Sequence, residues 1–199
     1  RLQTDSVEAL RLWTYYYHLT TDYAALAKLS DEWGISNLIS TFKQADYENR
    51  DAWTLYRLAQ ALDRQQRQEE ALALYSQARA LAPKIPDFIN KQASVLSKLG
   101  REREAEEAWN EALRLDQWHR EILNNLGFLY LQQGQWDKGR ALLERCLKRY
   151  PDYEMAWLNY ASWALQQGED EELIRSLQEV LRINPANQTA QQFMQSLGS

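Results

Sequence analysis

The sequence predicts an all-α protein, a solenoid of antiparallel helix pairs. Four prolines and seven glycines in 199 residues are too few turn residues for a many-stranded β protein, but they suit long helices joined by short turns. Helix-forming residues (Ala, Leu, Glu, Gln and Arg) dominate throughout the chain. Residues of matching type also recur every 34 positions, which is the signature of a stack of two-helix repeats.

The first 51 residues are the least regular part of the chain. We interpret residues 1–19 as a lone N-terminal helix and residues 20–51 as a degenerate repeat. In that repeat, Tyr23, Leu26 and Ala27 match the apolar stripe of a first helix, and Leu38, Phe42 and Ala45 match that of a second. The predicted helices cover about residues 6–19, 22–33 and 36–47, with Gly34 between the last two.

Four contiguous 34-residue units follow: 52–85, 86–119, 120–153 and 154–187. In the third, Leu123, Leu126, Gly127 and Tyr130 form an apolar stripe at i, i+3, i+4 and i+7. Each unit is therefore predicted to be a helix pair that must stack on its neighbours to bury its apolar face. The period is marked by Gly100, Gly134 and Gly168 at the turns and by Pro83, Pro151 and Pro185 at the ends.

Small residues recur where the two helices of a pair should touch. They predict close helix packing, with large residues filling the neighbouring holes. A final apolar stripe of Ala190, Phe193, Met194 and Leu197 predicts that residues 188–199 form a capping helix. The small residues are Ala59, Ala93, Gly127 and Ala161 on first helices and Ala71, Ala105 and Gly139 on second helices.

Period, residue sizes and turn positions together resemble the tetratricopeptide repeat. The resemblance covers residues 52–187 without a gap. Gln92, Leu173 and Gln117 depart from the motif, because Leu, Ala and Pro are usual at those places. The resemblance implies a right-handed superhelical solenoid whose first helices line a concave groove. It also implies a non-catalytic scaffold that binds a peptide or helix of a partner protein in that groove.

The resemblance places the groove on defined positions of the four first helices. Its N-terminal half is predicted to be basic and its C-terminal half apolar, which suits an acidic-then-hydrophobic peptide or a helix with one apolar face. Arg57, Lys91, Asn125 and Asn159 share one place in successive units and form a predicted polar ladder. The lysine-and-asparagine clamp with which some members bind chaperone C-termini needs an arrangement that this ladder lacks. The predicted partner-binding residues are Tyr56, Arg57, Gln60, Arg64, Asn90, Lys91, Lys98, Asn124, Asn125, Phe128, Met155, Leu158 and Asn159.

The sequence offers little chemistry beyond binding. His18 and His119 are the only histidines, and neither has a second metal ligand three or four residues away. Cys146 lies where the repeat needs a small buried side chain, so it is predicted to pack as a small hydrophobe. The sequence contains no nucleophile elbow, phosphate-binding loop or dinucleotide fingerprint, so we expect no enzyme, no cofactor and no metal.

The tryptophans are predicted to differ in burial. Trp109 and Trp157 fall on core stripes. Four others fall outside the stripes and are expected to be partly exposed, which would suit a binding surface because aromatic residues are enriched at interfaces. Packing between neighbouring repeats is the alternative. These four are Trp53, Trp118, Trp136 and Trp163.

Charge and hydropathy limit the partners. The net charge of −5 and the pI of about 5.2 disfavour nucleic acid. No apolar run approaches the roughly 18 residues of a transmembrane helix, so we expect no membrane insertion of this segment. A protein or peptide partner is therefore expected. The alternative is a homo-oligomer, in which an N-terminal helix carrying Trp13, Tyr15, Tyr16 and Tyr17 docks into a neighbouring groove.

The compartment can be addressed only by analogy. Sixteen arginines against seven lysines resemble bacterial usage, and many bacterial arrays of the resembled family serve cell-envelope assembly or polymer export. The start at Arg1 rather than Met is expected for a processed or excised chain. The expectation is a cytoplasmic or periplasmic protein, with the bacterial cell envelope favoured.

Overall fold

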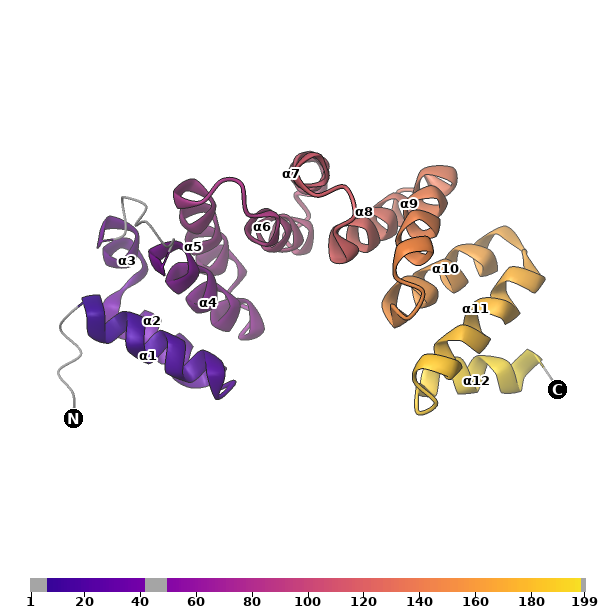
Figure 1. The fold of residues 1–199 in the computed structure, drawn as a ribbon, viewed down its shortest axis with the longest axis horizontal. Helices are drawn as coiled ribbons and strands as arrows, with labels where there is room; N and C mark the ends of the chain where they lie inside the picture. Colours follow the sequence, from indigo (N-terminus) through magenta and orange to yellow (C-terminus); the bar gives the residue numbers. More distant parts are fainter. Residues whose placement is uncertain (1–6, 42–49, 198–199) are drawn as a thin grey trace. The chain divides into compact units, whose positions relative to one another are not determined.

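The structure, a computed structural model, describes residues 7–41 and 50–197. Within these residues it is all-α, with twelve helices and no strand (Figure 1). The predicted fold class, an all-α solenoid of helix pairs, is confirmed. The chain divides into two compact units, unit 1 (Arg1–Leu115) and unit 2 (Asp116–Ser199).

The described helices follow the predicted pattern closely. The helices expected at 6–19 and 22–33 are observed as α1 and α2, and the third begins at Ile35. The predicted end of that third helix, with Phe42 and Ala45, lies outside the described residues. Unit 1 contains α1 (Val7–Leu19), α2 (Tyr23–Trp33), α3 (Ile35–Thr41), α4 (Arg50–Arg64), α5 (Gln68–Leu81), α6 (Pro86–Lys98) and α7 (Glu102–Leu115). Unit 2 contains α8 (Arg120–Gln132), α9 (Trp136–Arg149), α10 (Glu154–Gln167), α11 (Asp170–Ile183) and α12 (Gln188–Leu197).

One type of turn joins the two helices of each pair. At Gly134 the backbone adopts φ 72°, its N–H donates to the carbonyl of Leu131, and the N–H of Gln135 donates to the carbonyl of Tyr130. This pattern satisfies carbonyls at the end of the first helix and reverses the chain. The same two hydrogen bonds and a positive φ recur at Gln66, Gly100 and Gly168.

The turn between α1 and α2 is of this same type. Thr21 has φ 55°, its N–H donates to His18, and the N–H of Asp22 donates to Tyr17. The turn therefore joins α1 to α2 in the way that the other turns join a first helix to a second. In the sequence interpretation, by contrast, α2 is the first helix of its own pair, and that interpretation stays a prediction.

The helices of a pair touch through the predicted small residues. Ala59, Ala71, Ala93 and Ala105 are fully buried. In unit 2, a Cβ added to Gly139 would lie 2.9 Å from the carbonyl oxygen of Gly127, which is closer than real Cβ contacts. These contacts confirm that the small residues permit close helix packing.

The burial of the tryptophan side chains differs from the prediction at one position. Trp109 and Trp157 are buried as predicted, and Trp118 is exposed. Trp163 was expected to be partly exposed, and this was wrong because the side chain is only 4% exposed. It packs between helices, with its ring 5.0 Å from that of Tyr160 and the guanidinium of Arg140 4.7 Å from its centroid.

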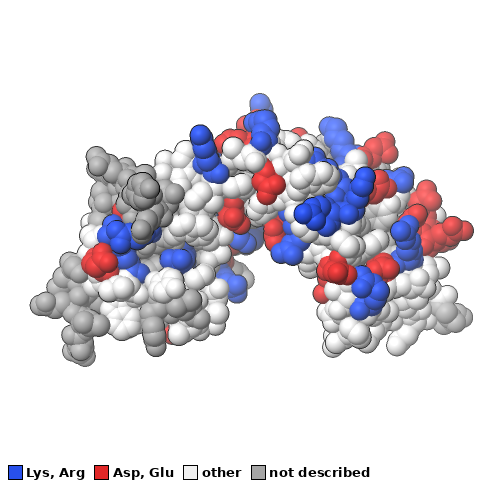
Figure 2. Space-filling model, viewed as in Figure 1, with Lys and Arg blue, Asp and Glu red and all other residues white. Residues whose placement is uncertain are grey.

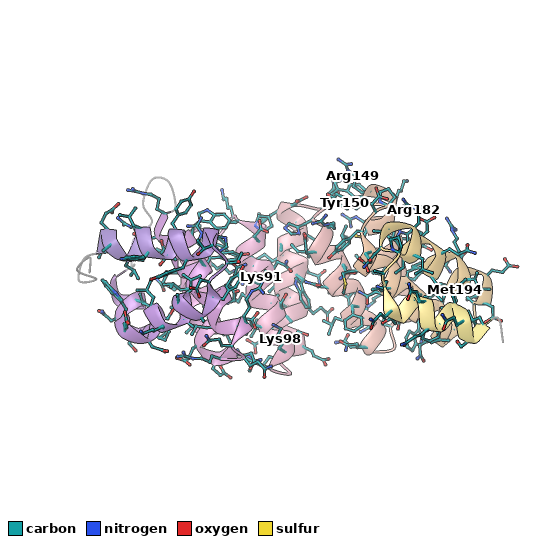
Figure 3. All side chains as sticks on the ribbon, turned by 90° about the horizontal axis from the view of Figure 1, so that it is seen from below. Lys91, Lys98, Arg149, Tyr150, Arg182 and Met194 are labelled. Carbon is teal, nitrogen blue, oxygen red and sulfur yellow. The ribbon has the colours of Figure 1, made fainter. Side chains whose placement is uncertain are left out.

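The last helix, α12, packs on α11. Its Ala190 is buried, Phe193 and Met194 are half-buried, and Leu197 is exposed (Figure 3). The side chain of Asn187 holds the start of this helix, since its Oδ1 accepts from the N–H of Ala190 and its Nδ2 donates to Glu154. Half-burial of one side is the arrangement expected for the end of a repeat stack.

Candidate partner-binding surfaces

Three of the predicted groove residues do not reach the surface. Tyr56 is 7% exposed and stacks on Phe88, with ring centroids 4.9 Å apart. Asn90 is buried and accepts a hydrogen bond of 2.9 Å from Nε1 of Trp109. Asn124 is buried as well. The expectation that these side chains face a partner is corrected, because their position on the first helix points into the packing between neighbouring helices.

Most of the polar groove residues of unit 1 have partners within the chain. The Nζ of Lys98 lies 2.7 Å from Oδ1 of Asp63, and the guanidinium of Arg64 lies 4.0 Å from the ring centroid of Tyr23. Gln60 donates to the hydroxyl of Tyr56. These contacts leave a smaller basic surface than the count of cations suggests.

Lys91 differs from Lys98 in this respect. The two lysines lie on the same side of α6, two turns apart (Figure 3). Lys91 is half-buried, and in the described parts of the chain no carboxylate lies within ion-pair distance of it. Its charge is therefore available to an acidic partner.

Arg57 is held by aromatic rings. Its guanidinium lies 5.3 Å from the ring centroid of Tyr15 on α1 and 6.0 Å from that of Trp53 on its own helix. Burial lowers the pKa of Arg57 from its ordinary value, and the side chain forms no ion pair with any residue that the structure describes. A half-buried cation with rings but no counter-ion is a candidate site for an anion.

Unit 2 presents an apolar surface, the unit 2 face, formed by Phe128 on α8 and by Met155, Leu158 and Leu165 on α10. Phe128, Met155 and Leu165 are 39%, 50% and 46% exposed, and Leu158 is half-buried. The helices α8 and α10 contact each other. Leu131, also on α8, is buried and lies outside this face.

An asparagine cluster joins the same two helices. Nδ2 of Asn159 donates to Oδ1 of Asn124 at 2.8 Å, and Nδ2 of Asn124 lies 3.4 Å from Oδ1 of Asn125. Part of the hydrogen-bonding capacity of the predicted ladder is thus used between α8 and α10. What remains exposed beside it is mainly apolar.

The charged side chains are mixed in sign on the face shown in Figure 2. Lysine and arginine lie among aspartate and glutamate there, without one broad patch of either sign. This distribution does not provide the basic stripe with which proteins commonly track a nucleic-acid backbone.

Two side chains carry shifted pKa values of chemical interest. Burial, followed by the charge of Arg57, lowers the pKa of His18. Burial raises the pKa of Cys146 to about 12, and the prediction that Cys146 packs as a small buried side chain is confirmed.

Among the described residues, no three His, Cys, Asp or Glu side chains are grouped so as to hold a metal ion. None of the helices in this part of the chain is long and apolar enough to span a bilayer.

Two family models match the chain, and both describe the tetratricopeptide repeat. One matches residues 38–86 in unit 1 and the other matches residues 121–163 in unit 2. The chain is a tetratricopeptide repeat protein. This tetratricopeptide repeat protein is 29% identical over 119 residues to the BBSome complex member BBS4 of Xenopus tropicalis. Those residues make up 60% of this chain, and the match spans only 23% of that relative.

Solved structures share the fold of this tetratricopeptide repeat protein. One from Parabacteroides merdae superposes with a TM-score of 0.68, covers 92% of this chain and 68% of that chain, and is 20% identical. YrrB, described as a TPR protein with an unusual peptide-binding site, gives a TM-score of 0.66, covers 97% and 94% of the two chains, and is 13% identical. At these identities the likeness shows the fold.

Proposed function

We propose that this tetratricopeptide repeat protein is a scaffold that binds a peptide or helix of a partner protein on its first helices. The observation that carries the proposal is the unit 2 face, where Phe128, Met155 and Leu165 are each more than a third exposed on two adjacent helices. Grouped exposed apolar side chains mark interaction surfaces, whereas scattered ones need no explanation.

The residues around the unit 2 face favour a partner with an apolar stripe. Phe128 and Met155 offer an aromatic ring and a flexible thioether, which adapt to apolar side chains of different shape. Asn125 and Asn159 lie beside them and carry amide groups that can bond a peptide backbone. The peptide-binding site that is described for YrrB, a protein of the same fold, agrees with this proposal.

In unit 1 the support comes from charge. Lys91 and Arg57 form no ion pair within the described chain, so an acidic segment of a partner would find two cations on α4 and α6. Such contacts also raise the association rate and contribute to specificity. The finer proposal is therefore a partner that combines acidic and apolar side chains.

Selection from a library of random peptides tests the proposal without knowledge of the native partner. Peptides enriched on the wild-type protein are measured by fluorescence polarisation against a variant with Phe128→Ala and Met155→Ala. Truncation of two interface anchors should weaken binding by about tenfold or more. The matched control is Ile174→Ala, since Ile174 is 37% exposed on the second helix α11 and should leave affinity unchanged.

Two results would overturn this proposal. One is a set of enriched peptides that bind the double variant as tightly as wild type. The other is a loss of affinity in Ile174→Ala alone, which would move the site to the second helices.

The alternative, self-association through the N-terminal helix, would require α1 to leave its place in its own chain. In this structure α1 packs on α2 and α4 of its own chain. Its Leu10 is 1% exposed, and Arg11 lies 2.5 Å from Oδ1 of Asp51. Docking into a second copy would first have to break these contacts.

A further inference from the structure

The helix α1 has the residue pattern of a repeat's first helix. Eleven residues before each turn of the Gly134 type stands a large buried side chain, and at the Thr21 turn this is Leu10. Seven residues before each turn stands a small one, and here it is Thr14, which is fully buried. The equivalent pairs on the other first helices are Leu55 and Ala59, Ile89 and Ala93, Leu123 and Gly127, and Trp157 and Ala161.

This register identifies the surface positions of α1. The ladder residues Arg57, Lys91, Asn125 and Asn159 each lie nine residues before a turn. Nine residues before Thr21 is Leu12, which is 63% exposed, and six before it is Tyr15, which is 50% exposed. These two side chains thus hold places that are predicted to face a partner on the other first helices.

An open cleft of about 310 Å³ lies between α1 and α4. Its apolar lining comes from Leu12, Tyr15 and Trp53. Its charged lining comes from three arginines and one glutamate: Arg11, Arg50, Arg57 and Glu8. We call this the Arg57 cleft.

Arg11 and Arg57 of the Arg57 cleft differ in their ion pairs. Arg11 bonds both Asp51 and Glu8, so the one lining carboxylate is already engaged. Arg57 forms no ion pair within the described chain, and the rings that contact its guanidinium do not neutralise it. The cleft therefore combines a partly desolvated positive charge with aromatic and aliphatic walls.

We propose that the Arg57 cleft binds a carboxylate of a partner peptide together with the apolar or aromatic side chain beside it. Guanidinium groups pair strongly with carboxylates, and partial burial reduces screening by water and salt. Tyr15 and Trp53 supply faces on which a second ring can stack. The inference rests on the proposed function, because it names a subsite for the same kind of partner. Neither family match includes α1, so Leu12 and Tyr15 lie outside the matched repeats, whereas Trp53 and Arg57 lie within the match over residues 38–86.

Three small probes test the chemistry directly. N-acetylphenylalanine offers a terminal carboxylate, N-acetylglutamyl-phenylalaninamide offers a side-chain carboxylate, and N-acetylphenylalaninamide offers neither. Binding is followed by NMR at the indole N–H of Trp53, assigned with Trp53→Phe. Carboxylate-bearing probes of this size should bind with a Kd on the order of 1 mM, and the neutral amide should bind at least about fivefold more weakly. The two carboxylate probes distinguish a peptide C-terminus from an internal acidic residue.

Matched variants locate the site. Arg57→Gln should reduce the affinity for the carboxylate probes by about tenfold and remove the preference over the amide. Leu12→Ser changes an exposed side chain, so it should keep the fold while weakening all three probes severalfold. Lys28→Gln, an exposed cation on α2 of the same unit, should change nothing.

The proposal is overturned if no carboxylate-dependent shift occurs at Trp53, or if Arg57→Gln binds the probes as well as wild type. These failures are distinguishable from failure of the proposed function. If library peptides still lose affinity in the Phe128 and Met155 variant, only the Arg57 cleft is wrong. If they do not, the scaffold proposal fails as well.

Discussion

The first helices of the two units place different chemistry at equivalent positions. At the Gln66 and Gly100 turns of unit 1, the residue nine before the turn is Arg57 or Lys91, each without an ion pair in the described chain. In unit 2 it is Asn125 or Asn159, in a cluster that joins α8 to α10 beside exposed Phe128. Seven residues before the turn, by contrast, the buried residue is small in both units: Ala59 and Ala93 in unit 1, Gly127 and Ala161 in unit 2. The difference shows that packing restricts one face of a first helix and leaves the opposite face open for recognition.

The largest expected effect tests the shared packing. Gly139→Leu should destabilise unit 2 by about 3 kcal/mol or more, because even a Cβ there meets the backbone of Gly127. Urea unfolding followed by circular dichroism measures the loss. Ala141→Leu, at an exposed position of α9, is the control and should change stability by less than about 0.5 kcal/mol. Equal stability of the two variants would show that the close approach of α8 and α9 does not contribute to the stability of unit 2.

The next effect sharpens the contrast between the two surfaces. Arg57→Ala with Lys91→Ala should weaken an acidic library peptide by about 1.5–3 kcal/mol, more than tenfold, and flatten the salt dependence of its affinity. Phe128→Ala should weaken an apolar peptide to a similar degree at low and high salt, since hydrophobic contact is not screened. Titrations at two salt concentrations check both. Matching salt dependence for the two variants would erase the distinction between the units.

A smaller effect concerns His18, beside Arg57 in unit 1. Its pKa is lowered in the folded chain, so at acid pH the unfolded chain takes up a proton that the folded chain resists. Stability should therefore fall as the pH drops through about 6.5, the ordinary value of histidine, toward the lower folded value. His18→Gln should show a shallower fall in melting temperature between neutral and mildly acidic pH. His119→Gln, in unit 2, is the comparison variant, and an equal change in both would contradict a specific contribution of the buried His18.

The smallest expected change is an absence of reaction. With its pKa near 12 and its side chain buried, Cys146 should remain unmodified by a thiol reagent at pH 8 in the native state and react fully in denaturant. Rapid native modification, measured by mass spectrometry, would mean that unit 2 opens far more readily than its packing indicates.

Most of the helices could be predicted, because packing of the repeats requires the same pattern of residues in each of them. Buried stripes and turn residues repeat every 34 positions, and the helices at 7–19 and 23–33 begin within a residue of their expected places. The type of turn at Thr21 was not predicted, because the Thr21 and Gln66 turns are 45 residues apart, eleven more than the period, and neither turn is marked by glycine. The segment between these two turns contains the additional helix α3.

The groove was harder to predict residue by residue. Asn90, Asn124 and Tyr56 are polar or amphipathic, so their types suggest a surface, but Trp109, Asn159 and Phe88 satisfy or cover them. The burial of Trp163 depends on Arg140 from another helix. Such partners are set by the stacking of helices and leave no periodic signal in the sequence.

The backbone at Thr21 and Gln66 has a consequence for how the array opens. Both residues adopt the left-handed conformation in which glycine stands at Gly134 and Gly168. A side chain in that conformation costs roughly 1 kcal/mol relative to glycine, so two turns of unit 1 close less favourably than their counterparts in unit 2. Amide protons of α1 and α4 should then exchange with deuterium before those of α8 and α10. A protease that cleaves locally opened segments should then cut near α1 and α4 before it cuts near α8 and α10.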